Sequence, residues 1–409
     1  MKITLVHRFF WPDTPPYAVM LRHIAGCLAK DKHDVTVIST QPSYKNNYVI
    51  EQQPWIEKID GFTVKRLKLK AENKSSFISR IVGMLTFTFK LFIQLLKEKP
   101  DTVMIATTPP LIGGLAVRYA CKIVGAKYIY HCQDIYPEVA LVSGHLKNKY
   151  LLSLLKRIDK KTCDNAVATV VLSQDMKQSL IERGCHGKNI HIINNFELVP
   201  FLDKNQTAEK QNNNIPIDMI RPKGIFRVLF AGNIGRFQGL ESIIETAHYL
   251  HKHDSVEFVF LGEGVSKLPL EDMAGENLGK TIKFFGHQPI EIARALIADS
   301  QLCLITLNEG IYKYAYPSKT MTYMCEGIPV AVMAELTSEL SESVIINNLG
   351  IAVKQGDAKK LANLIEDLYK NNERLEEIRK NVSDFSRINF SMQYVLPKWV
   401  SLFKNHKTK

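Results

Sequence analysis

A glycine-rich turn in the middle of the chain has the composition of a phosphate-binding loop. It runs from Gly232 to Gly239, directly after the apolar run 226–231 and before a predicted amphipathic helix. Backbone N–H groups in such a turn, together with the N-terminus of the next helix, form a cradle for an anion. Arg236 adds a planar fork of donors that suits diphosphate oxygens. The turn therefore predicts a nucleotide-phosphate site in the second half of the chain.

Other residues of the second half carry the same chemistry. Lys319, after Ser318, stands in the first turn of a predicted helix, where a cation is unfavourable unless an anion binds that end. The alternative is a solvated lysine on a helix that Ser318 caps, but Arg236 in the same half favours the anion site. Gly262 and Gly286 follow two further apolar strands. Because ligands of open parallel sheets bind at the carboxyl ends of strands, we expect these segments to line one crevice.

A polar cluster follows a predicted strand of the first half. It contains His131, Asp134 and Glu138, placed where an α/β domain presents ligand-binding residues. This position makes the three side chains candidates for catalysis. A cap of a turn or helix for Asp134, and a satisfied, partly buried imidazole for His131, stay open as alternatives.

Segment 77–97 is almost entirely apolar, apart from one narrow stripe when it is wound as a helix. The stripe consists of Ser79, Gly83, Thr86, Lys90, Gln94 and Lys97. Arg80 and Lys90 interrupt the apolar run, so the segment is a poor transmembrane span. An apolar arc this wide exceeds what one sheet face covers. We expect the helix to lie in a membrane interface, with Phe87, Phe89 and Phe92 at the acyl boundary; the alternative is a well-buried domain helix.

The composition restricts the partners. The chain has 409 residues, of which 45% are apolar, and an excess of Lys and Arg gives it a net charge of +12. This length fits two ordinary domains, and the charge favours anionic partners. Because no nucleic-acid-binding motif accompanies the charge, we expect phosphate ligands and anionic lipid, and no nucleic acid.

The cysteines indicate the cellular compartment of the protein, and the histidines bear on whether it binds a metal. The seven cysteines are scattered and form no Cys-x-x-Cys pair, which is typical of a reducing cytosol. His248, His251 and His253 resemble a metal-ligand set, but they close a predicted helix, where protonated histidine is favourable. The N-terminus enters a short strand and then meets charged residues, which leaves no room for a signal-peptide core. We therefore expect a cytoplasmic protein without a metal or other cofactor.

Short β-rich runs alternate with helical patterns in both halves, which predicts parallel sheets built from crossover units. The predicted strands are 3–6, 35–39, 103–106, 128–130, 167–172 and 190–193, then 228–230, 257–261, 282–284, 302–306 and 329–333. Polar residues and prolines predict a linker at 203–222. We expect domains at 1–202 and 223–389, with a C-terminal helix at about 390–409 that packs back on the first domain.

Together these segments resemble the bacterial glycosyltransferases of family 4, which have the two-domain GT-B fold. The resemblance covers nearly the whole chain and rests on Phe10–Asp13, Lys32–Val37, Thr108–Leu111, Gln133–Glu138, Ala231–Glu241, Pro317–Lys319 and Tyr323–Val330. It is closest to the branch that assembles O-antigen and capsule repeat units, including N-acetyl-L-fucosamine transferases. The fold it implies is α/β, with two doubly wound Rossmann-like domains whose parallel sheets face each other across a cleft.

The resemblance implies a retaining, metal-independent transfer of a sugar from a nucleotide donor, most often UDP-linked, with UDP-N-acetyl-L-fucosamine as one case. The acceptor it implies is a polyprenyl-diphosphate-linked glycan, so the protein would be peripheral on the inner face of the plasma membrane. Asp134 would face the reacting sugar, and Arg236 and Lys319 would neutralise the leaving diphosphate. The donor-binding residues it implies are Gly232, Asn233, Arg236, Gln238, Gly262, Glu263, Gly286, His287, Tyr316, Ser318, Lys319, Thr320 and Thr322.

The chain departs from the family pattern at positions near the donor. Tyr314 and Thr322 stand where the family often has two glutamates, and Gln133 stands where a histidine often precedes the aspartate. The donor sugar and the acid–base assignment therefore stay open. Two other functions fit the same architecture: a UDP-sugar 2-epimerase, which needs no acceptor, and an inert protein that binds a nucleotide or a lipid-linked glycan.

Overall fold

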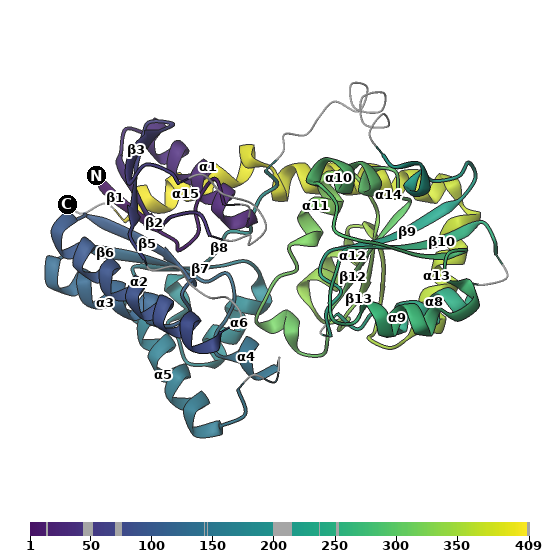
Figure 1. Cartoon of the computed structure of the whole chain (residues 1–409), viewed down its shortest axis with the longest axis horizontal. Coiled ribbons are helices and arrows are strands. Elements are labelled where there is room, and N and C mark those ends of the chain that lie inside the picture. Colours follow the sequence, from purple (N-terminus) through teal and green to yellow (C-terminus); the bar gives the residue numbers. More distant parts are fainter. Residues whose placement is uncertain are drawn as a thin grey trace. The chain divides into compact units, whose positions relative to one another are not determined.

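The computed structural model describes residues 1–13, 15–43, 52–69, 76–142, 144, 146–198, 215–236, 238–250 and 253–406. These residues form two compact units (Figure 1). The first unit contains the described residues up to Leu198, the short segment Tyr314–Tyr316 and the C-terminal segment from Met392. The second contains the described residues of 215–313 and Pro317–Ser391. Most of the linker expected at 203–222 lies outside the described residues.

The first unit is built on an eight-stranded sheet in the order β3-β4-β2-β1-β5-β6-β7-β8. Its strands are β1 (Lys2–Val6), β2 (Asp34–Thr40), β3 (Ile56–Ile59), β4 (Phe62–Leu67), β5 (Thr102–Ala106), β6 (Lys127–His131), β7 (Ala168–Val171) and β8 (Ile190–Ile192). All neighbouring pairs in these described residues are parallel, except β3 with β4. The parallel sheet predicted for this half is thus confirmed, with an added antiparallel edge.

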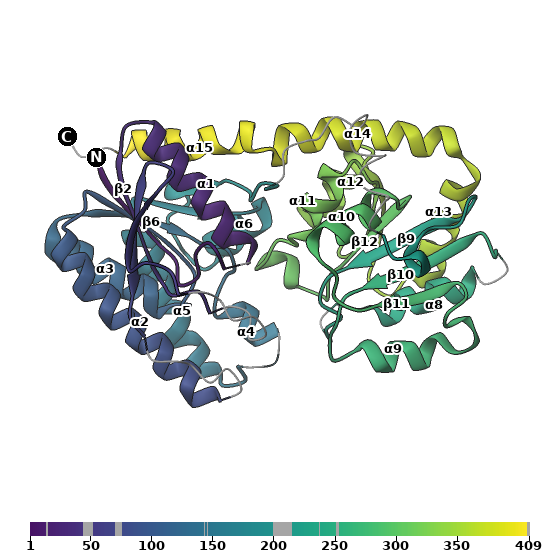
Figure 2. The ribbon, with the colours of Figure 1, turned by 45° about the horizontal axis from the view of Figure 1, so that its top comes forward.

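Helices cover both faces of this sheet (Figure 2). They are α1 (Pro16–Lys30), α2 (Phe77–Glu98), α3 (Ile112–Val124), α4 (Glu138–Val142), α5 (Lys149–Asn165), α6 (Gln174–Glu182) and α15 (Met392–Asn405). On the face of α1 and α15, Leu5 and Trp399 belong to one core. On the face of α2, α3 and α5, Ile105 and Tyr130 belong to another. Successive strand residues point to opposite faces, which supplies both cores.

The structure corrects part of the membrane expectation for α2. Phe87 is wholly buried in the core beneath this helix and has no exposed surface with which to reach lipid. Phe92 is partly buried and packs against the same core. Phe89, by contrast, is 67% exposed. The helix is therefore anchored by one apolar face and presents another to solvent.

The second unit is built on a six-stranded sheet in the order β11-β10-β9-β12-β13-β14, and its neighbouring strands are parallel. Its strands are β9 (Phe226–Ala231), β10 (Val256–Leu261), β11 (Ile282–Phe285), β12 (Leu302–Thr306), β13 (Val330–Met333) and β14 (Gly350–Val353). Its helices are α8 (Glu241–Tyr249), α9 (Lys267–Ala274), α10 (Ile290–Ala298), α11 (Lys319–Cys325), α12 (Glu339–Ile346), α13 (Ala358–Lys370) and α14 (Asn372–Phe390). α10, α11 and α14 cover one face, and α8, α9 and α13 cover the other (Figure 1). Both halves are doubly wound, as predicted.

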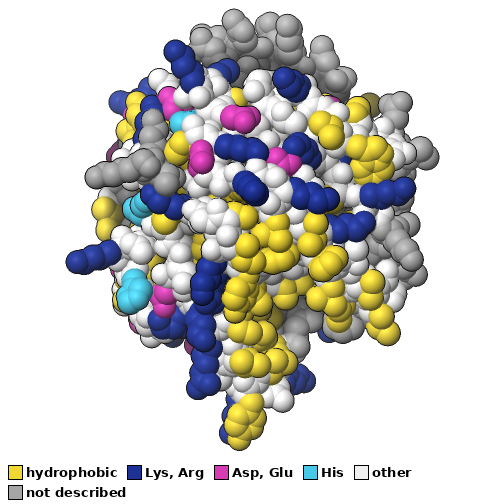
Figure 3. All heavy atoms as spheres, turned by 90° about the vertical axis from the view of Figure 1, so that its left-hand side faces the viewer, with side chains coloured by type: hydrophobic (Ala, Val, Ile, Leu, Met, Phe, Trp, Pro, Cys, Tyr) yellow, Lys and Arg dark blue, Asp and Glu magenta, His cyan; other side chains and the backbone are white. Residues whose placement is uncertain are grey.

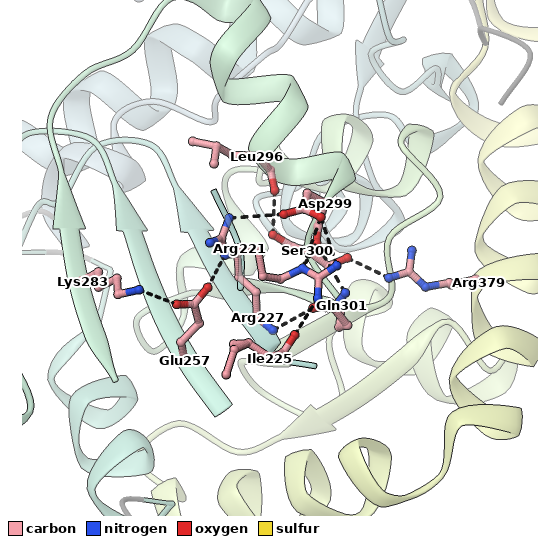
Figure 4. A network of polar contacts seen from close by, with 10 residues as sticks. All are labelled: Arg221, Ile225, Arg227, Glu257, Lys283, Leu296, Asp299, Ser300, Gln301 and Arg379. Carbon is pink, nitrogen blue, oxygen red and sulfur yellow. Dashed lines mark hydrogen bonds and ion pairs between the residues drawn. The ribbon is translucent and has the colours of Figure 1, made fainter. Parts of the chain in front are cut away.

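A polar network closes the amino edge of the second sheet (Figure 4). Arg227 and Glu257 lie near the starts of β9 and β10, both side chains are buried, and Arg227 Nε donates to Glu257 Oε1 at 2.6 Å. Lys283 Nζ, near the start of β11, lies 2.8 Å from Glu257 Oε2. Arg221 donates a hydrogen bond to the carboxylate of Asp299 at 3.1 Å. Arg379 of α14 donates a hydrogen bond to the backbone carbonyl oxygen of Ser300 at 2.8 Å. The network therefore ties three strands, α14 and the segment before β9 together.

Replacing Glu257 with glutamine should lower the free energy of unfolding by about 3–5 kcal/mol. The reason is that Arg227 would keep its charge in a buried site after losing its closest counter-ion. Urea unfolding of parent and variant measures the loss. Asp384→Asn, in an exposed pair with Arg387, is the control and should change stability little. A loss no larger than that of the control would show that the buried pair does not stabilise this edge.

Candidate active site

The glycine turns predicted in the second half lie side by side at the carboxyl edge of the second sheet. Past the end of β9, Gly232 N donates to Leu261 O at 2.8 Å. Past the end of β10, Gly262 N donates to Phe285 O at 2.9 Å. Strand pairing thus continues into the turns that follow β9 and β10. In the turn after β11, a Cβ on Gly286 would lie 2.8 Å from Glu263 Oε1 of the turn after β10. The structure brings these three turns together, as the sequence predicts.

Two of these glycines occupy positions where a side chain does not fit. Gly262 has a φ of +148°, and a Cβ on it would lie 2.0 Å from Gly232 O. Gly232 has a φ of +139°, and a Cβ on it would lie 2.7 Å from Lys319 Cε. Glycine at 262 therefore allows the turns to approach, and glycine at 232 leaves room for Lys319.

Lys319 lies across the glycine turn. Its Nζ lies 3.6 Å from the centroid of the Phe230 ring and donates to Gln238 Oε1 at 3.1 Å. Loss of hydration lowers the pKa of Lys319 to about 7. An anion beside this amine would favour its charged form and replace the hydration it has lost.

Tyr323 fixes the helix that carries Lys319. Its buried hydroxyl donates to Ala231 O at 3.0 Å and accepts from Ala231 N at 2.8 Å. These two bonds join α11 to the last residue of β9. Nothing in the spacing of the sequence indicates them, because Tyr323 and Ala231 are separated by 92 residues.

The remaining donor-binding residues expected from the sequence are spread over the same edge. Ser318 is exposed and stands at the N-cap position of α11, but within the described residues its side chain makes no capping hydrogen bond, which corrects the cap that the alternative interpretation expects. Thr320 is buried, and Thr322 is partly exposed. Tyr316 belongs to the first unit, where it packs on the core beneath α2. The exposed residues at the turns are Asn233, Arg236, Glu263 and His287.

A polar cavity of about 210 Å³ lies beside Gln238. The polar side chains that line it are Gln238, Ser242, Thr306, Asn308, Glu309 and Gln355. Thr306 ends β12, and its buried hydroxyl has no hydrogen-bond partner among the described residues. Since Gln238 also accepts from Lys319, the cavity adjoins the lysine. Its carboxylate, amides and hydroxyls suit a ligand rich in hydroxyl groups.

In the first unit, His131 is buried and both of its ring nitrogens are engaged. Nδ1 lies 2.7 Å from the Tyr17 hydroxyl, and Nε2 lies 2.7 Å from Gln133 Nε2. Gln133 in turn exchanges two hydrogen bonds with Asn195, at 3.1 and 2.8 Å. Burial lowers the pKa of His131 to about 3. The structure therefore corrects the expected catalytic role: this neutral, buried imidazole positions the loop after β6.

Asp134 lies on that loop and is partly exposed. Its backbone forms an antiparallel bridge with Ala315, and the next residue, Ile135, donates its N–H to Tyr314 O at 2.8 Å. Burial raises the pKa of Asp134 to about 6. A carboxyl group with a pKa near neutrality can take up or release a proton under physiological conditions. Asp134 thus keeps the properties expected of a catalytic residue.

Glu138 is buried in an ion-pair network behind this loop. Its carboxylate pairs with Arg183 and with Lys156, the latter at 3.3 Å. Arg183 also pairs with Asp159, so the network joins α4, α5 and the end of α6. A carboxylate held by two cations inside the protein does not reach a substrate, which corrects the expected catalytic role of Glu138.

The described histidines of the set that resembles metal ligands contact different parts of the second unit. His248 Nε2 lies 3.5 Å from Ala274 O, and His253 Nε2 lies 3.2 Å from Glu366. His251 lies outside the described residues. In the part of the chain that the structure describes, no three His, Cys, Asp or Glu side chains are grouped so that they could hold a metal ion.

Both halves of the chain match known families. Residues 17–195 match the family described as glycosyl transferase 4-like domain, and residues 213–385 match the family described as glycosyl transferases group 1. A protein of Escherichia coli K12 named as the colanic acid biosynthesis glycosyl transferase WcaI is 26% identical over 351 residues. The matched region covers 84% of this chain and 85% of that protein.

Solved structures share the fold over nearly the whole chain. Sucrose-phosphate synthase from Thermosynechococcus elongatus superposes with a TM-score of 0.75 at 16% identity, covering 98% of both chains. Anabaena Alr3699/HepE, solved in complex with UDP, superposes with a TM-score of 0.71 at 15% identity, covering 99% of this chain and 100% of its own. At such low identity these likenesses show the fold alone.

Proposed function

Because the chain belongs to the family 4 glycosyltransferases with the GT-B fold, we propose that it transfers a sugar from a UDP-linked donor to a polyprenyl-diphosphate-linked glycan. The observation that carries the proposal is Lys319, an under-hydrated amine held over a glycine turn. The E. coli relative is named for colanic acid synthesis and the Anabaena structure holds UDP, which support a polysaccharide product and a UDP donor. UDP-N-acetyl-L-fucosamine is the donor we would test first.

In the proposed donor complex, each part of the nucleotide sugar meets a different group. The diphosphate lies at Lys319 and Arg236, whose charges stabilise the leaving group. The nucleoside lies toward the turns at Gly262 and Gly286. The sugar extends into the cavity that contains Glu309, where polar side chains meet its hydroxyl groups.

In the first unit, we assign Asp134 to the acceptor and the reacting sugar. Its pKa of about 6 lets it exchange a proton near neutral pH. His131 and Gln133 hold the loop, and the Glu138–Arg183 pair supports it from behind. The transfer is proposed to retain the anomeric configuration, to take place in the cytoplasm and to use an acceptor in the inner face of the plasma membrane.

A chelator should leave turnover intact, because we assign the charge of the leaving diphosphate to Lys319 and Arg236 rather than to a metal ion. The measurement compares the initial rate of transfer before and after extensive treatment with EDTA. A control with added magnesium should show the same rate. Complete loss of activity that magnesium or manganese restores would contradict the assignment.

The affinity for a nucleotide sugar should fall as the pH rises through about 7, the pKa of Lys319. Below this pH the free protein carries the charge, and above it the charge is lost. The bound diphosphate diester stays ionised over this pH range and raises the pKa of Lys319 in the complex. The affinity for the nucleotide sugar should therefore be constant below about pH 7 and fall by up to about tenfold per pH unit above it. Calorimetric titration over about pH 6 to 9 measures the slope. A Lys319→Met variant should lack it, and a parent protein without the slope would contradict the assignment.

The experiment that tests the proposed function separates transfer from isomerisation. Purified protein is incubated with a labelled UDP-sugar and no acceptor. A transferase leaves the nucleotide sugar largely intact, because its second substrate is missing, and calorimetry should still detect binding of UDP. Conversion of the sugar to its 2-epimer without acceptor would identify an epimerase and overturn the proposal. Absence of UDP binding would overturn the donor assignment.

A further inference from the structure

The outer side of α2 is an apolar ridge. It consists of Ile78, Val82, Leu85, Phe89 and Ile93, whose exposed fractions are 73%, 55%, 54%, 67% and 36%. Steps of three and four residues place them on one side of the helix. The opposite side carries Phe87, Leu91 and Leu95, which are wholly buried. The helix therefore has two apolar sides, and the core of the first unit uses one of them.

The ridge continues onto two neighbouring helices. α3 packs against α2, and α5 packs against α3. Large apolar side chains on these helices are also exposed: Tyr119, Ile123, Tyr150, Leu151 and Leu154. Figure 3 shows the resulting hydrophobic area, with a column of Lys and Arg side chains along one side of it. We call the outward side of α2, α3 and α5 the three-helix face.

The charge of the three-helix face is strongly positive. The three helices contain ten Lys and Arg but three Asp and Glu. Each of these acids is paired with a cation: Glu98 with Lys65, Asp159 with Arg183 and Asp164 with Lys160. The three acids offset only three of the ten positive charges, so the three helices keep a net charge of +7. An apolar strip bordered by cations is complementary to a bilayer that contains anionic phospholipid.

We propose that the three-helix face docks flat on an anionic phospholipid bilayer, with the α2 ridge among the acyl chains and the Lys and Arg side chains at the headgroups. The purpose of this contact rests on the proposed function, since a lipid-linked acceptor is reached from the same surface. Docking would raise the local concentration of that acceptor.

The buried side of α2 decides between lying on the bilayer and crossing it. Ile78–Glu98 is long and apolar enough to span a membrane by length and composition. However, Phe87, Leu91 and Leu95 belong to the core beneath the sheet of the first unit. Spanning would remove these side chains from that core and leave it open. The helix therefore lies in the plane of the interface, as amphipathic helices of peripheral proteins do.

The test measures binding of the full chain to phosphatidylglycerol-containing vesicles by co-sedimentation. The ridge variant carries Leu85→Glu and Phe89→Glu, both at positions more than half exposed, so the fold should tolerate them. The matched control carries Ile345→Glu and Ile346→Glu, which are 56% and 78% exposed on α12 of the second unit. We expect the ridge variant to bind at least about tenfold more weakly and the control to bind like the parent. Binding of the parent should also weaken as salt rises.

UDP affinity, vesicle binding and oligomeric state together distinguish the possible outcomes. UDP affinity of the ridge variant should match the parent, which shows that it is folded and that donor binding is separate. The docking proposal would be overturned if the parent did not bind anionic vesicles, or if the folded ridge variant bound them with the affinity of the parent. Neither result would contradict the proposed glycosyl transfer. A parent dimer that the ridge variant loses, seen by light scattering, would overturn the docking proposal as well, because the face would then be an interface between copies.

Discussion

Replacing Asp134 with asparagine should reduce the rate of sugar transfer by about 10²–10⁴-fold, the range for loss of a positioned acid or base. Asparagine has nearly the same shape, and the backbone bridge from residue 134 to Ala315 does not use the side chain. What the variant loses is a carboxyl group that burial has brought to a pKa of about 6. The loss should therefore fall on turnover, while the affinity for UDP stays the same.

Steady-state rates and calorimetry on the same preparation check this result. Asp60→Asn is a matched control, because Asp60 also carries a carboxyl group of the first unit but lies on an exposed turn beside Arg22. In the parent, the pH profile of transfer should show a step near 6, which the Asp134 variant should lack. A folded variant that retains nearly the parent rate would remove Asp134 from the mechanism.

Replacing Lys319 with alanine should lower kcat/KM for the nucleotide sugar by about 10²–10³-fold, as loss of one group that stabilises a leaving anion does. The amine also contributes to the ground state, so the affinity for UDP should fall by about 1.5–3 kcal/mol. The side chain lies over Gly232 and Phe230, and shortening it removes its contact with the Phe230 ring and its hydrogen bond to Gln238. The two bonds of Tyr323 that join α11 to β9 remain. The fold should therefore survive.

Lys370→Ala is the matched control for Lys319. Lys370 lies in the same unit, at the end of α13, and makes an exposed ion pair with Glu366. Its loss should change UDP affinity little. The assignment of the diphosphate to Lys319 would be contradicted if UDP bound both variants with the affinity of the parent.

Much of the fold follows from features that are local in sequence. Buried strands such as β9 and β10 are apolar apart from one charged residue each, Arg227 and Glu257, and a glycine follows each of them, which is why they and the turns after them could be predicted. β3 and β4 were missed for different reasons. β3 is an edge strand whose residues are exposed or partly exposed and show no buried face. β4 buries only every second residue and contains Lys65 and Arg66, so it does not form a continuous apolar run. β14 was also missed, because it has four residues and begins at Gly350, where a Cβ would lie 1.9 Å from Val330 O.

The candidate site was predictable only where residue type alone limits the chemistry. A lysine and an arginine near glycine turns indicate an anion site wherever the chain places them. The roles of His131 and Glu138 depend instead on their contacts with Tyr17 and Arg183, which are 114 and 45 residues away along the chain. For α2, the sequence shows an apolar arc wider than one contact needs. The packing of Phe87 in the core shows which side of α2 is buried, and the periodicity of the sequence alone does not predict that side.

The most direct test of the proposed function follows a labelled sugar from nucleotide to lipid. Purified protein is incubated with UDP-sugars, beginning with UDP-N-acetyl-L-fucosamine, and with vesicles that contain a polyprenyl-diphosphate-linked glycan. We expect label to pass into the organic phase with an equal release of UDP. Neither should occur without acceptor, and both should be slower by about 10²–10⁴-fold with Asp134→Asn. Label that stays on the nucleotide as an epimer, or UDP release that needs only water, would contradict it.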